Sequence, residues 1–438
     1  METLQRTAGR RPNRGFAFFR AGTKVVERLS YAELLQASKS VAGALRKRGV
    51  DPGERALLTF PAGLDFIRAF WGCVCAGIIP VPAPPIQETR RERTLGRLKR
   101  LSEDCEPALM LDPETLEKLK SDPARWQPPP PQEVAFLQYT SGSTRQPSGV
   151  VVTQRNIQAN LSMLATFQGA HSSIVMVHWL PLYHDMGLVR GMLSPVDLGA
   201  DCYFMDPLEF IQNPATWLNA LSHFQATLTG APNFGYELAA EKAQLQAQPD
   251  LSHLQVAFCS AEPIRHQTVQ KFIQKFGPGG LNPGAFKPSY GLAEATVAVA
   301  GETGPRCKCR ELSLSALRDN RVEQPREESD VTTLVACGGP LGELDVRIVS
   351  DRKSLLPDSI GEVWLRGPSV AQGYWKTTPD SDPFQSYLQT NEGPFLRTGD
   401  LGFLDHEGSL FITGREKDLI LIRGQNFHPH DIEATLEE

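Results

Sequence analysis

Apolar positions change their period several times in the first eighty residues of the chain. Ser30, a good helix N-cap, precedes apolar residues at helical spacing, which predicts a helix over residues 30–50. A short apolar run at 55–60 predicts a buried strand, and the apolar stretch at 64–76 predicts a second helix that ends at Gly77. This alternation indicates an α/β fold with a mostly parallel sheet covered by helices.

The same alternation continues to about residue 300 and then gives way to short strands. Strands are predicted at 173–180, 226–231 and 254–260, and helices at 210–223, 232–247 and 265–276. Beyond residue 335, short apolar runs are separated by glycine, aspartate and proline. That pattern predicts a small β-barrel or sandwich, and of the two we expect a distorted barrel.

We therefore expect four parts along the chain. Two αβα-layered subdomains are predicted at 1–170 and 171–334, a β-barrel subdomain at 335–417, and a hinge with the shortened start of a further domain at 418–438. Residues 303–333 are charged and poor in apolar periodicity, so we interpret them as an insertion or a mobile loop.

The composition excludes several classes of protein. With 41% hydrophobic and 22% charged residues, the chain has enough apolar material for a sizeable core. A net charge of −5 gives no electrostatic reason to expect a nucleic-acid partner. No apolar run of about 18 residues is present, so no membrane span is predicted. The arginine-bearing N-terminus lacks a following apolar stretch and does not match a secretory signal.

The eight cysteines contain no C-x-x-C pair, so the usual zinc spacing is absent. Cys73 with Cys75 and Cys307 with Cys309 form two C-x-C pairs. Most of the cysteines lie in apolar runs, where buried thiols are expected. A reducing, cytoplasmic location therefore fits best.

The most specific chemical signal is the loop TSGSTRQPSG at residues 140–149, which lies between two apolar strands. Its hydroxyl groups and backbone N–H groups can donate to phosphate oxygens. It lacks the Gly-Lys-Ser/Thr of a Walker A motif, and the same composition also suits a plain linker.

Further segments follow the loop: WLPLYHDMGL (179–188), SAEP (260–263), SYGLAEAT (289–296), RTGDL (397–401) and GREKD (414–418). In this order they resemble the motifs of the adenylate-forming superfamily of acyl-CoA synthetases, adenylation domains and luciferases. Their wording is most similar to the fatty acyl-AMP ligase branch, and the resemblance extends over nearly the whole chain. It implies ATP-dependent activation of a fatty acid to acyl-AMP, with Mg²⁺ as cofactor and an acyl carrier protein as acceptor.

The resemblance assigns a role to individual residues around the nucleotide. The phosphates would be held by Thr140, Ser141, Gly142, Ser143 and Thr144. Arg145 stands where the family commonly has glycine and Ser148 where it has lysine, so Arg145 would supply the lost positive charge. Glu294 would hold Mg²⁺, which prefers carboxylate oxygen. Tyr290 would stack on adenine, and Asp400 would accept hydrogen bonds from the ribose. Other expected nucleotide ligands are Ser260, Ala261, Glu262, Gly291, Thr296 and Arg415.

On the acyl side, the resemblance places His184 beside the substrate carboxylate. The expected apolar pocket lies near Leu188, Gly191, Gly230, Pro232 and Phe234. Lys417 would mark the hinge about which a C-terminal domain moves between two half-reactions. Residues of these types also serve ordinary packing, so each assignment has a purely structural alternative. Gln154, where the family often has histidine, receives no interpretation.

Three features favour the ligase branch over acyl-CoA synthetases: the loop ending T-R-Q-P-S-G, the LPLYHDMGL segment, and the extra residues 303–333. In that branch an insertion restrains the C-terminal domain and disfavours CoA. A fatty acyl-CoA synthetase, an amino-acid adenylation domain and a non-catalytic nucleotide- or lipid-binding homologue remain as alternatives. The family's C-terminal domain carries a lysine that assists adenylation. Because this sequence stops just past the hinge, we expect it to adenylate slowly.

Overall fold

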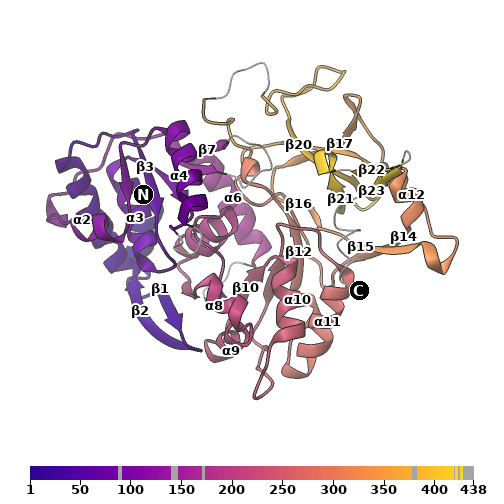
Figure 1. Cartoon of the computed structure of the whole chain (residues 1–438), viewed down its shortest axis with the longest axis horizontal. Helices are drawn as coiled ribbons and strands as arrows, with labels where there is room; N and C mark the ends of the chain where they lie inside the picture. The colour runs from indigo at the N-terminus through magenta and orange to yellow at the C-terminus, as the bar shows by residue number, and fades with distance from the viewer. Residues whose placement is uncertain are drawn as a thin grey trace.

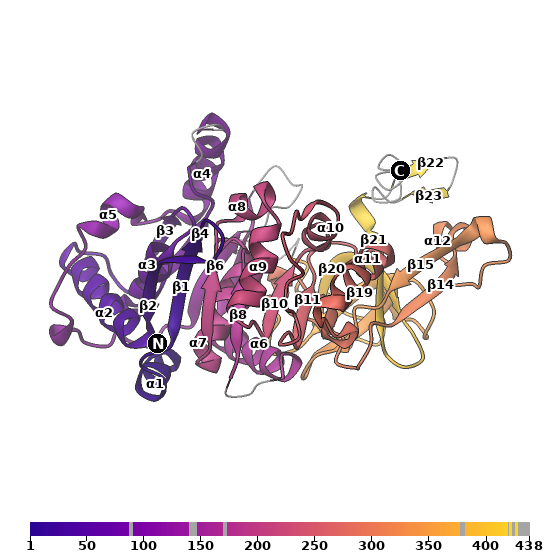
Figure 2. The same cartoon turned by 90° about the horizontal axis from the view of Figure 1, so that it is seen from below.

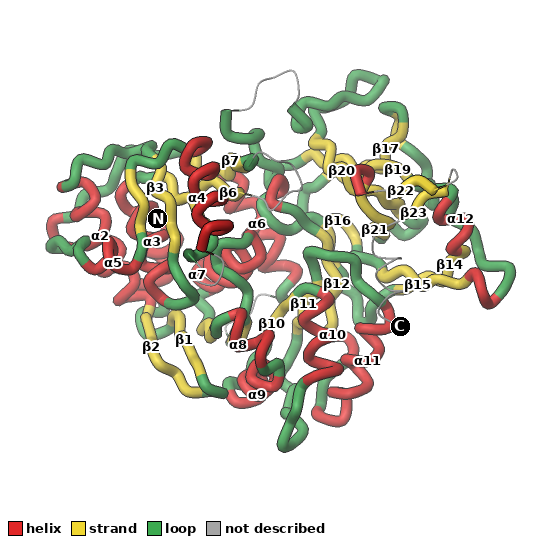
Figure 3. Tube along the Cα trace, in the orientation of Figure 1, coloured by secondary structure: helices red, strands yellow, loops and turns green. Residues whose placement is uncertain are grey.

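The computed structural model describes residues 1–86, 91–139, 147–169, 173–376 and 382–418, with the backbone of 420–422 and 425–427. Helices and strands alternate through the N-terminal two thirds of the chain, and strands and loops dominate the rest (Figure 3). The N-terminal part and the strand-rich part lie at opposite ends of the molecule (Figure 1).

Nine strands form the largest sheet of the described part, in the order β16-β13-β12-β11-β10-β8-β9-β1-β2. They are β1 (Gly15–Arg20), β2 (Lys24–Ser30), β8 (Val175–His178), β9 (Asp201–Phe204), β10 (Leu228–Ala231), β11 (Val256–Cys259), β12 (Phe286–Tyr290), β13 (Ala300–Gly301) and β16 (Gly339–Pro340). The strands from β12 to β1 pair in parallel, and β2, β13 and β16 are antiparallel at the edges. The predicted α/β fold with a mostly parallel sheet is confirmed.

The helices of the described part cover this sheet and the smaller ones. They are α1 (Glu2–Arg10), α2 (Tyr31–Lys47), α3 (Leu64–Ala76), α4 (Arg91–Cys105), α5 (Pro113–Glu117), α6 (Gln154–Phe167), α7 (Ser194–Leu198), α8 (Pro207–Gln212), α9 (Ala215–His223), α10 (Asn233–Lys242), α11 (His266–Phe276) and α12 (Leu314–Arg318). The first predicted helix does begin after Ser30, whose hydroxyl accepts from the Glu33 N–H in a capping box. The second ends at Gly77, which has φ +77°, a conformation that glycine adopts without strain.

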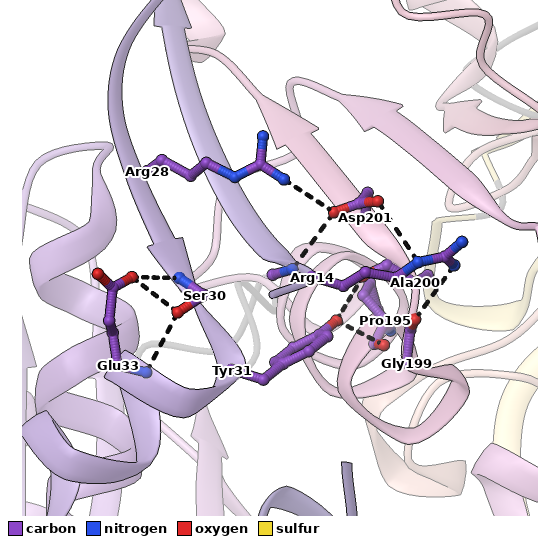
Figure 4. A network of polar contacts seen from close by, with 10 residues as sticks. Arg14, Arg28, Ser30, Tyr31, Glu33, Pro195, Gly199, Ala200 and Asp201 are labelled. Carbon is purple, nitrogen blue, oxygen red and sulfur yellow. Dashed lines mark hydrogen bonds and ion pairs between the residues drawn. The ribbon is translucent and has the colours of Figure 1, made fainter. Parts of the chain in front are cut away.

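Strands β1 and β2 precede the expected boundary at residue 170 yet lie in the sheet whose other members follow it. A buried joint holds them there (Figure 4). The Tyr31 hydroxyl lies 2.8 Å from the Pro195 carbonyl and 2.6 Å from the Ala200 carbonyl. Beside it, Asp201 accepts hydrogen bonds from Gly15 N–H at 3.4 Å and from Arg28 at 3.3 Å. The N-terminal strands are thus an integral edge of the large sheet.

Two smaller sheets lie in the N-terminal part. Strands β3 (Arg55–Thr59), β4 (Ile79–Ala83) and β5 (Leu109–Leu111) form a parallel sheet in the order β4-β3-β5. Strands β6 (Val134–Tyr139) and β7 (Gly149–Thr153) form an antiparallel pair that flanks residues 140–148. Their register fixes where the loop between them begins and ends.

The strand-rich part is an antiparallel sheet in the order β18-β17-β19-β20-β21. Its members are β17 (Asp345–Ser350), β18 (Lys353–Ser354), β19 (Gly361–Arg366), β20 (Leu396–Leu404) and β21 (Leu410–Arg415). A barrel was expected here; the pairings of the described residues give a five-stranded sheet with β18 and β21 at its ends. The short strands β22 (Ile420–Ile422) and β23 (Gln425–Phe427) pair with each other.

Residues 303–333, expected to be an insertion or a mobile loop, contain a hairpin and a short helix; that they are an insertion stays a prediction. Strands β14 (Cys309–Ser313) and β15 (Val331–Val335) pair antiparallel, and α12 follows β14 directly. Lys308, just before β14, forms ion pairs with Asp405 and Glu407, each at 2.6 Å. The sequence did not predict these strands because much of the hairpin is half-exposed and charged, which weakens its alternation of apolar and polar residues.

Candidate active site

The expected nucleotide residues meet at the carboxyl ends of neighbouring parallel strands. Gly230 lies near the end of β10, Ser260 directly follows β11, and Tyr290 ends β12. Ala231 pairs with Cys259, and Cys259 with Pro288, so these three strand ends lie side by side. The carboxyl edge of a parallel sheet is the usual place for ligands in α/β proteins.

Tyr290, Asp400 and Arg415 form a hydrogen-bonded cluster, although 110 residues separate the first two. The Tyr290 hydroxyl donates to Asp400 Oδ2 at 2.5 Å, and Arg415 Nε donates to Asp400 Oδ1 at 2.8 Å. Asp400 is 3% exposed and Tyr290 9%. The structure therefore brings together three of the predicted nucleotide ligands around one buried carboxylate.

Glu362 of β19 holds the irregular stretch of β20 that carries Asp400. Its carboxylate accepts from Gly399 N–H at 3.1 Å, from Arg397 Nε at 2.8 Å and from Trp364 Nε1 at 2.8 Å. The Thr398 hydroxyl accepts from the Asp400 N–H at 3.0 Å. Gly399 has φ +72°, which is readily adopted only by glycine. These contacts fix the direction of the Asp400 carboxylate before any ligand binds.

Burial raises the pKa of Asp400, and the positive charge of Arg415 and the Tyr290 hydroxyl act in the opposite direction. The Asp400 charge in turn raises the pKa of Arg415. Because desolvation outweighs the two donors, the carboxylate is still under-satisfied. Further hydrogen-bond donors, such as the hydroxyls of a ribose, would stabilise its charged form.

Glu294 lies close to this cluster and is joined to the strand that follows the hydroxyl-rich loop. The Tyr374 hydroxyl donates to Glu294 Oε1 at 2.7 Å. The backbone of Tyr374 forms an antiparallel bridge with Val150 of β7, and Trp375 N–H donates to the Gly149 carbonyl at 2.7 Å. One side chain thus spans from the end of the loop to the expected magnesium ligand.

The turn that carries Glu294 is held from two sides. Asn160 of α6 donates through Nδ2 to the carbonyls of Ala295 at 3.1 Å and Ala298 at 3.0 Å. The Thr296 hydroxyl donates to the Ser369 carbonyl at 2.8 Å, so it fixes the turn in this state. A Cβ at Gly291 would lie 1.7 Å from the Val297 carbonyl oxygen, so the close approach of these chains requires glycine.

Burial is also the main cause that raises the pKa of Glu294. The negative charge of Asp185 adds to this rise, and the Tyr374 hydrogen bond and the Arg415 charge oppose it. The charges of Asp185, beside His184, and of Arg415 therefore both act on the Glu294 carboxylate.

His184 and Asp185 form a close pair, with Nδ1 2.6 Å from Asp185 Oδ1. The Met186 N–H donates to the same oxygen at 2.7 Å, which is a better acceptor for it than His184 Nδ1 at 3.4 Å. His184 Nδ1 is therefore the donor toward Asp185, and the charge of Asp185 is the largest cause that raises the pKa of His184. The histidine side chain is 46% exposed, which leaves it accessible to a substrate.

The adenine-side residues follow β11. Ser260 is buried, whereas Ala261 and Glu262 are exposed. Ala261 has φ +77°, an uncommon conformation for a residue with a side chain. Glu262 accepts from the Phe234 N–H at 2.5 Å and so ties this turn to the start of α10.

Side chains occupy part of the predicted acyl pocket. A Cβ at Gly230 would lie 2.2 Å from the Phe258 ring, and one at Gly191 2.8 Å from His178, so side chains fill both positions. Leu188 is fully buried, and Pro232 is half-buried at the end of β10. Phe234 is 41% exposed and packs edge-on against Trp179 at 5.7 Å. The course of an acyl chain past these residues stays a prediction.

The remaining predicted residues lie outside the described part of the chain or away from this cluster. Thr140, Ser141, Gly142, Ser143, Thr144 and Arg145 lie outside the described residues. Lys417 lies in a short 3₁₀ helix, Glu416–Asp418, and is exposed there. Ser148 is half-buried just before β7.

Comparison with known proteins identifies this arrangement. A model of the family described as AMP-binding enzyme matches residues 4–375. The chain is 39% identical to the medium-chain-fatty-acid–[acyl-carrier-protein] ligase JamA of Moorena producens, over 97% of this chain and 78% of the relative. It is 35% identical to the long-chain-fatty-acid–AMP ligase FadD26 of Mycobacterium marinum, over 94% of this chain and 77% of the relative. The chain belongs to the fatty acyl-AMP ligase branch of the AMP-binding enzymes.

Solved structures of fatty acyl-AMP ligases have the same fold. A fatty acid AMP ligase from Legionella pneumophila matches with a TM-score of 0.89 and 34% identity, over 95% of this chain and 76% of that one. A fatty acyl-adenylate ligase from L. pneumophila, in complex with acyl adenylate and pyrophosphate, gives 0.89 and 35%, over 100% and 80%. Within the described part of this ligase-family chain, no helix is both long and apolar enough to cross a membrane.

Besides Asn160, sequence reasoning missed three residues that shape the site of this fatty acyl-AMP ligase homologue. Tyr374 lies in the GYW segment, Asp185 in the LPLYHDMGL segment, and Glu362 in the GEVWLRG strand. Asp185 could have been found, because a carboxylate directly after a candidate histidine is a common way to orient it. Glu362 and Tyr374 act through partners about 35 and 80 residues away, so no local signal marks them.

Proposed function

We propose that this chain activates a fatty acid with ATP to give acyl-AMP and pyrophosphate, and that the acyl group is then transferred to an acyl carrier protein. The observation that carries the proposal is the double contact of Tyr374, which joins the strand after the hydroxyl-rich loop to Glu294. The names of JamA and FadD26 and the acyl adenylate bound in the L. pneumophila ligase support it.

The nucleoside would bind at the carboxyl edge of the large sheet. Asp400 offers an oriented carboxylate to the ribose hydroxyls, and Arg415 beside it offers a cation to ribose or phosphate. Tyr290, Gly291 and the turn at Ser260, Ala261 and Glu262 would border the adenine. Thr296 is already engaged with the Ser369 carbonyl, so it would contribute by holding the Glu294 turn.

Glu294 fits a magnesium ion bound together with the phosphates. Its carboxylate is half-buried and has a pKa raised by burial, so a nearby cation would favour its charged form. No cluster of three or more metal-ligating His, Cys, Asp or Glu side chains is found in the described ranges. Mg²⁺ commonly uses one or two carboxylates and completes its shell with phosphate and water. When bound, it would neutralise charge on the phosphates that the fatty acid must approach.

The chemistry needs positioning more than proton transfer. A carboxylate oxygen forms a bond to the α-phosphorus while the bond from that phosphorus to the pyrophosphate oxygen breaks. Both reactants are anions, so the residues must hold them together against their repulsion. His184, made more basic by Asp185, would attract the fatty acid carboxylate, and Arg145 and the hydroxyls of the loop would hold the phosphates. No covalent intermediate on the chain is required.

The free thiols support a cytoplasmic location for the protein. All eight cysteines are free, including Cys307 and Cys309 with their sulfur atoms 4.0 Å apart. Free thiols at this spacing persist in a reducing compartment.

The test is fatty-acid-dependent formation of acyl-AMP from ATP and Mg²⁺, detected by mass spectrometry, together with calorimetric binding of a non-hydrolysable acyl-adenylate analogue. We expect binding of the analogue, and product that requires the fatty acid. Parallel reactions with CoA, with an amino acid and with a phosphopantetheine-bearing carrier protein separate the ligase from its alternatives. Failure to bind the analogue would show that the chain is not an adenylate-forming enzyme.

A further inference from the structure

Helix α4 is the most basic exposed element beside the proposed site. It carries five Lys or Arg residues and three Asp or Glu residues, in a chain whose net charge is −5. Figure 2 shows it standing away from the body of the molecule, on the same side as α8 and α10. Leu98, Leu101 and Cys105 are buried and anchor its inner face.

Three arginines occupy one side of this helix. Arg93, Arg97 and Arg100 are spaced four and three residues apart, so their side chains share a face. Arg93 and Arg100 are exposed and Arg97 is half-buried. None of the three forms an ion pair with a carboxylate in the parts of the chain that the structure covers. Within the described residues, the arginine face, as we call Arg93, Arg97 and Arg100, is therefore a row of positive charges without ion-pair partners.

The arginine face leads to the active site. Asp104, eleven residues after Arg93 and on the same side of the helix, accepts a hydrogen bond from the hydroxyl of Tyr139, which ends β6. The neighbouring Gln138 donates to the carbonyl of Tyr183 at 3.0 Å, and Tyr183 directly precedes His184. The positive charge of Arg97 acts on the Tyr183 hydroxyl and lowers its pKa against the effect of burial. The foot of α4 thus lies at the loop and the acyl-activation residues.

The length of the row indicates the kind of ligand. With about 1.5 Å of rise per residue, Arg100 lies about 6 Å, Arg97 about 10 Å and Arg93 about 16 Å along the axis from Asp104. The row therefore extends about 10 Å along the helix from Arg100 to Arg93. An anion that contacts the whole row must be extended, as an acidic surface of a thiol-bearing carrier protein would be.

We propose that the arginine face of α4 is the docking surface for the carrier protein, which contacts it through an acidic helical surface beside its phosphopantetheine. This inference rests on the proposed function, since it names the surface used by the acceptor. Arg93 and Arg97 orient the carrier protein, and the row of charge directs its prosthetic arm along α4 toward Tyr183 and His184. Exposed charges of this kind mainly steer association and set its register.

The experiment measures binding of a holo acyl carrier protein with an acidic surface to the full chain, by fluorescence anisotropy at 50 mM and 300 mM salt. Arg93→Glu is compared with Lys99→Glu, which makes the same change of charge on the opposite side of the same helix. We expect Arg93→Glu to weaken binding about fivefold or more at low salt and to flatten the salt dependence, and Lys99→Glu to change it less than twofold. Because Arg93 is exposed, both variants should keep the parent melting temperature.

Two further measurements separate this inference from the function it rests on. Acyl-AMP formation without carrier protein should be unchanged by Arg93→Glu, and its absence in the parent chain would contradict the proposed function alone. Equal carrier binding by the parent and Arg93→Glu, equal weakening by Lys99→Glu, or no carrier binding at all would overturn the docking surface. Binding of vesicles of one part phosphatidylglycerol to three parts phosphatidylcholine, lost in Arg93→Glu while carrier binding persists, would assign the face to a membrane and overturn it as well.

Discussion

Replacing Asp400 with asparagine should separate ligand binding from folding stability. The substitution keeps the size of the side chain and one acceptor oxygen, and it removes the charge. Tyr290 can still donate to the remaining oxygen, but the new amide N–H₂ faces Arg415 with donor against donor. The Arg415 side chain is 61% exposed, so it can turn into solvent at little cost.

The effect on nucleotide affinity follows from the hydrogen bonds that a carboxylate makes. A bond to a charged group contributes about 1.5–3 kcal/mol, and Asp400→Asn removes one such acceptor from the ribose. Since about 1.4 kcal/mol is a factor of ten, we expect the affinity for AMP or an acyl-adenylate analogue to fall about 10- to 150-fold. Isothermal titration calorimetry measures it directly.

Although Asp400→Asn weakens nucleotide binding, it should leave the stability of the ligand-free protein unchanged or raise it. The pKa of Asp400 is raised in the fold, so its stabilising contribution is complete below its ordinary pKa of 3.8 and is lost as the pH rises through the raised value. At pH 8 the buried negative charge of Asp400 destabilises the fold, and Asp400→Asn removes that charge. The melting temperature without ligand should therefore be unchanged or higher at pH 8, and the gain should disappear near pH 4.

Asp345→Asn is the matched control, because Asp345 is a half-buried carboxylate of the same sheet that pairs with Arg347 and Arg366. It should leave nucleotide affinity within twofold of the parent. The reasoning is refuted if Asp400→Asn binds nucleotide normally, or if it lowers the melting temperature at pH 8 by more than Asp345→Asn does.

Other consequences are equally direct. Tyr374→Phe removes the donor to Glu294 and should raise the Mg²⁺ concentration for half-maximal ATP binding about threefold or more. An unchanged Mg²⁺ titration would show that Tyr374 does not influence the metal. In the parent, fatty acid binding should decline as the pH rises through the raised pKa of His184, because the charged imidazole attracts the carboxylate. Asp185→Asn should move the decline in fatty acid affinity to lower pH. Calorimetric titrations from pH 5.5 to 9 would contradict this prediction if the decline had the same midpoint in the variant and the parent. Asn160→Ala leaves two buried carbonyls without their donor and should lower the free energy of unfolding in urea by about 1–3 kcal/mol. A loss below about 0.5 kcal/mol would show that Asn160 is not needed to hold the Glu294 turn.

Local signals explain which parts of the fold were predictable. Helix α2 begins where Ser30 caps it and α3 ends at a left-handed Gly77, and both signals lie in the residues that form the boundary. The pairing of Phe16 with Cys202, which places β1 in the large sheet, connects residues far apart in the sequence. Nothing in the apolar pattern of β1 distinguishes that partner from the nearer β3. The chain-order division at residue 170 therefore had no means of including β1 and β2 in the later sheet.

The site residues, like the elements of the fold, include some that local sequence marks and others that only long-range contacts reveal. Motif reasoning predicted Glu294, Asp400 and His184, because the resemblance marks these residues by type. It did not predict the groups that orient their segments: Glu362, which bonds to the stretch of β20 that carries Asp400, and Asn160, which holds the Glu294 turn. Such groups act on backbone atoms of distant segments, and only the folded contacts reveal them.

Tyr374 links the proposed magnesium ligand to the strand that follows the hydroxyl-rich loop. Its backbone is fixed to β7, and its hydroxyl donates to the acid that would bind Mg²⁺. Because burial disfavours the charge on Glu294, we expect a strong metal site to form only when phosphates and cation arrive together. Binding of the nucleotide would then complete the electrostatic arrangement that allows two anions to meet.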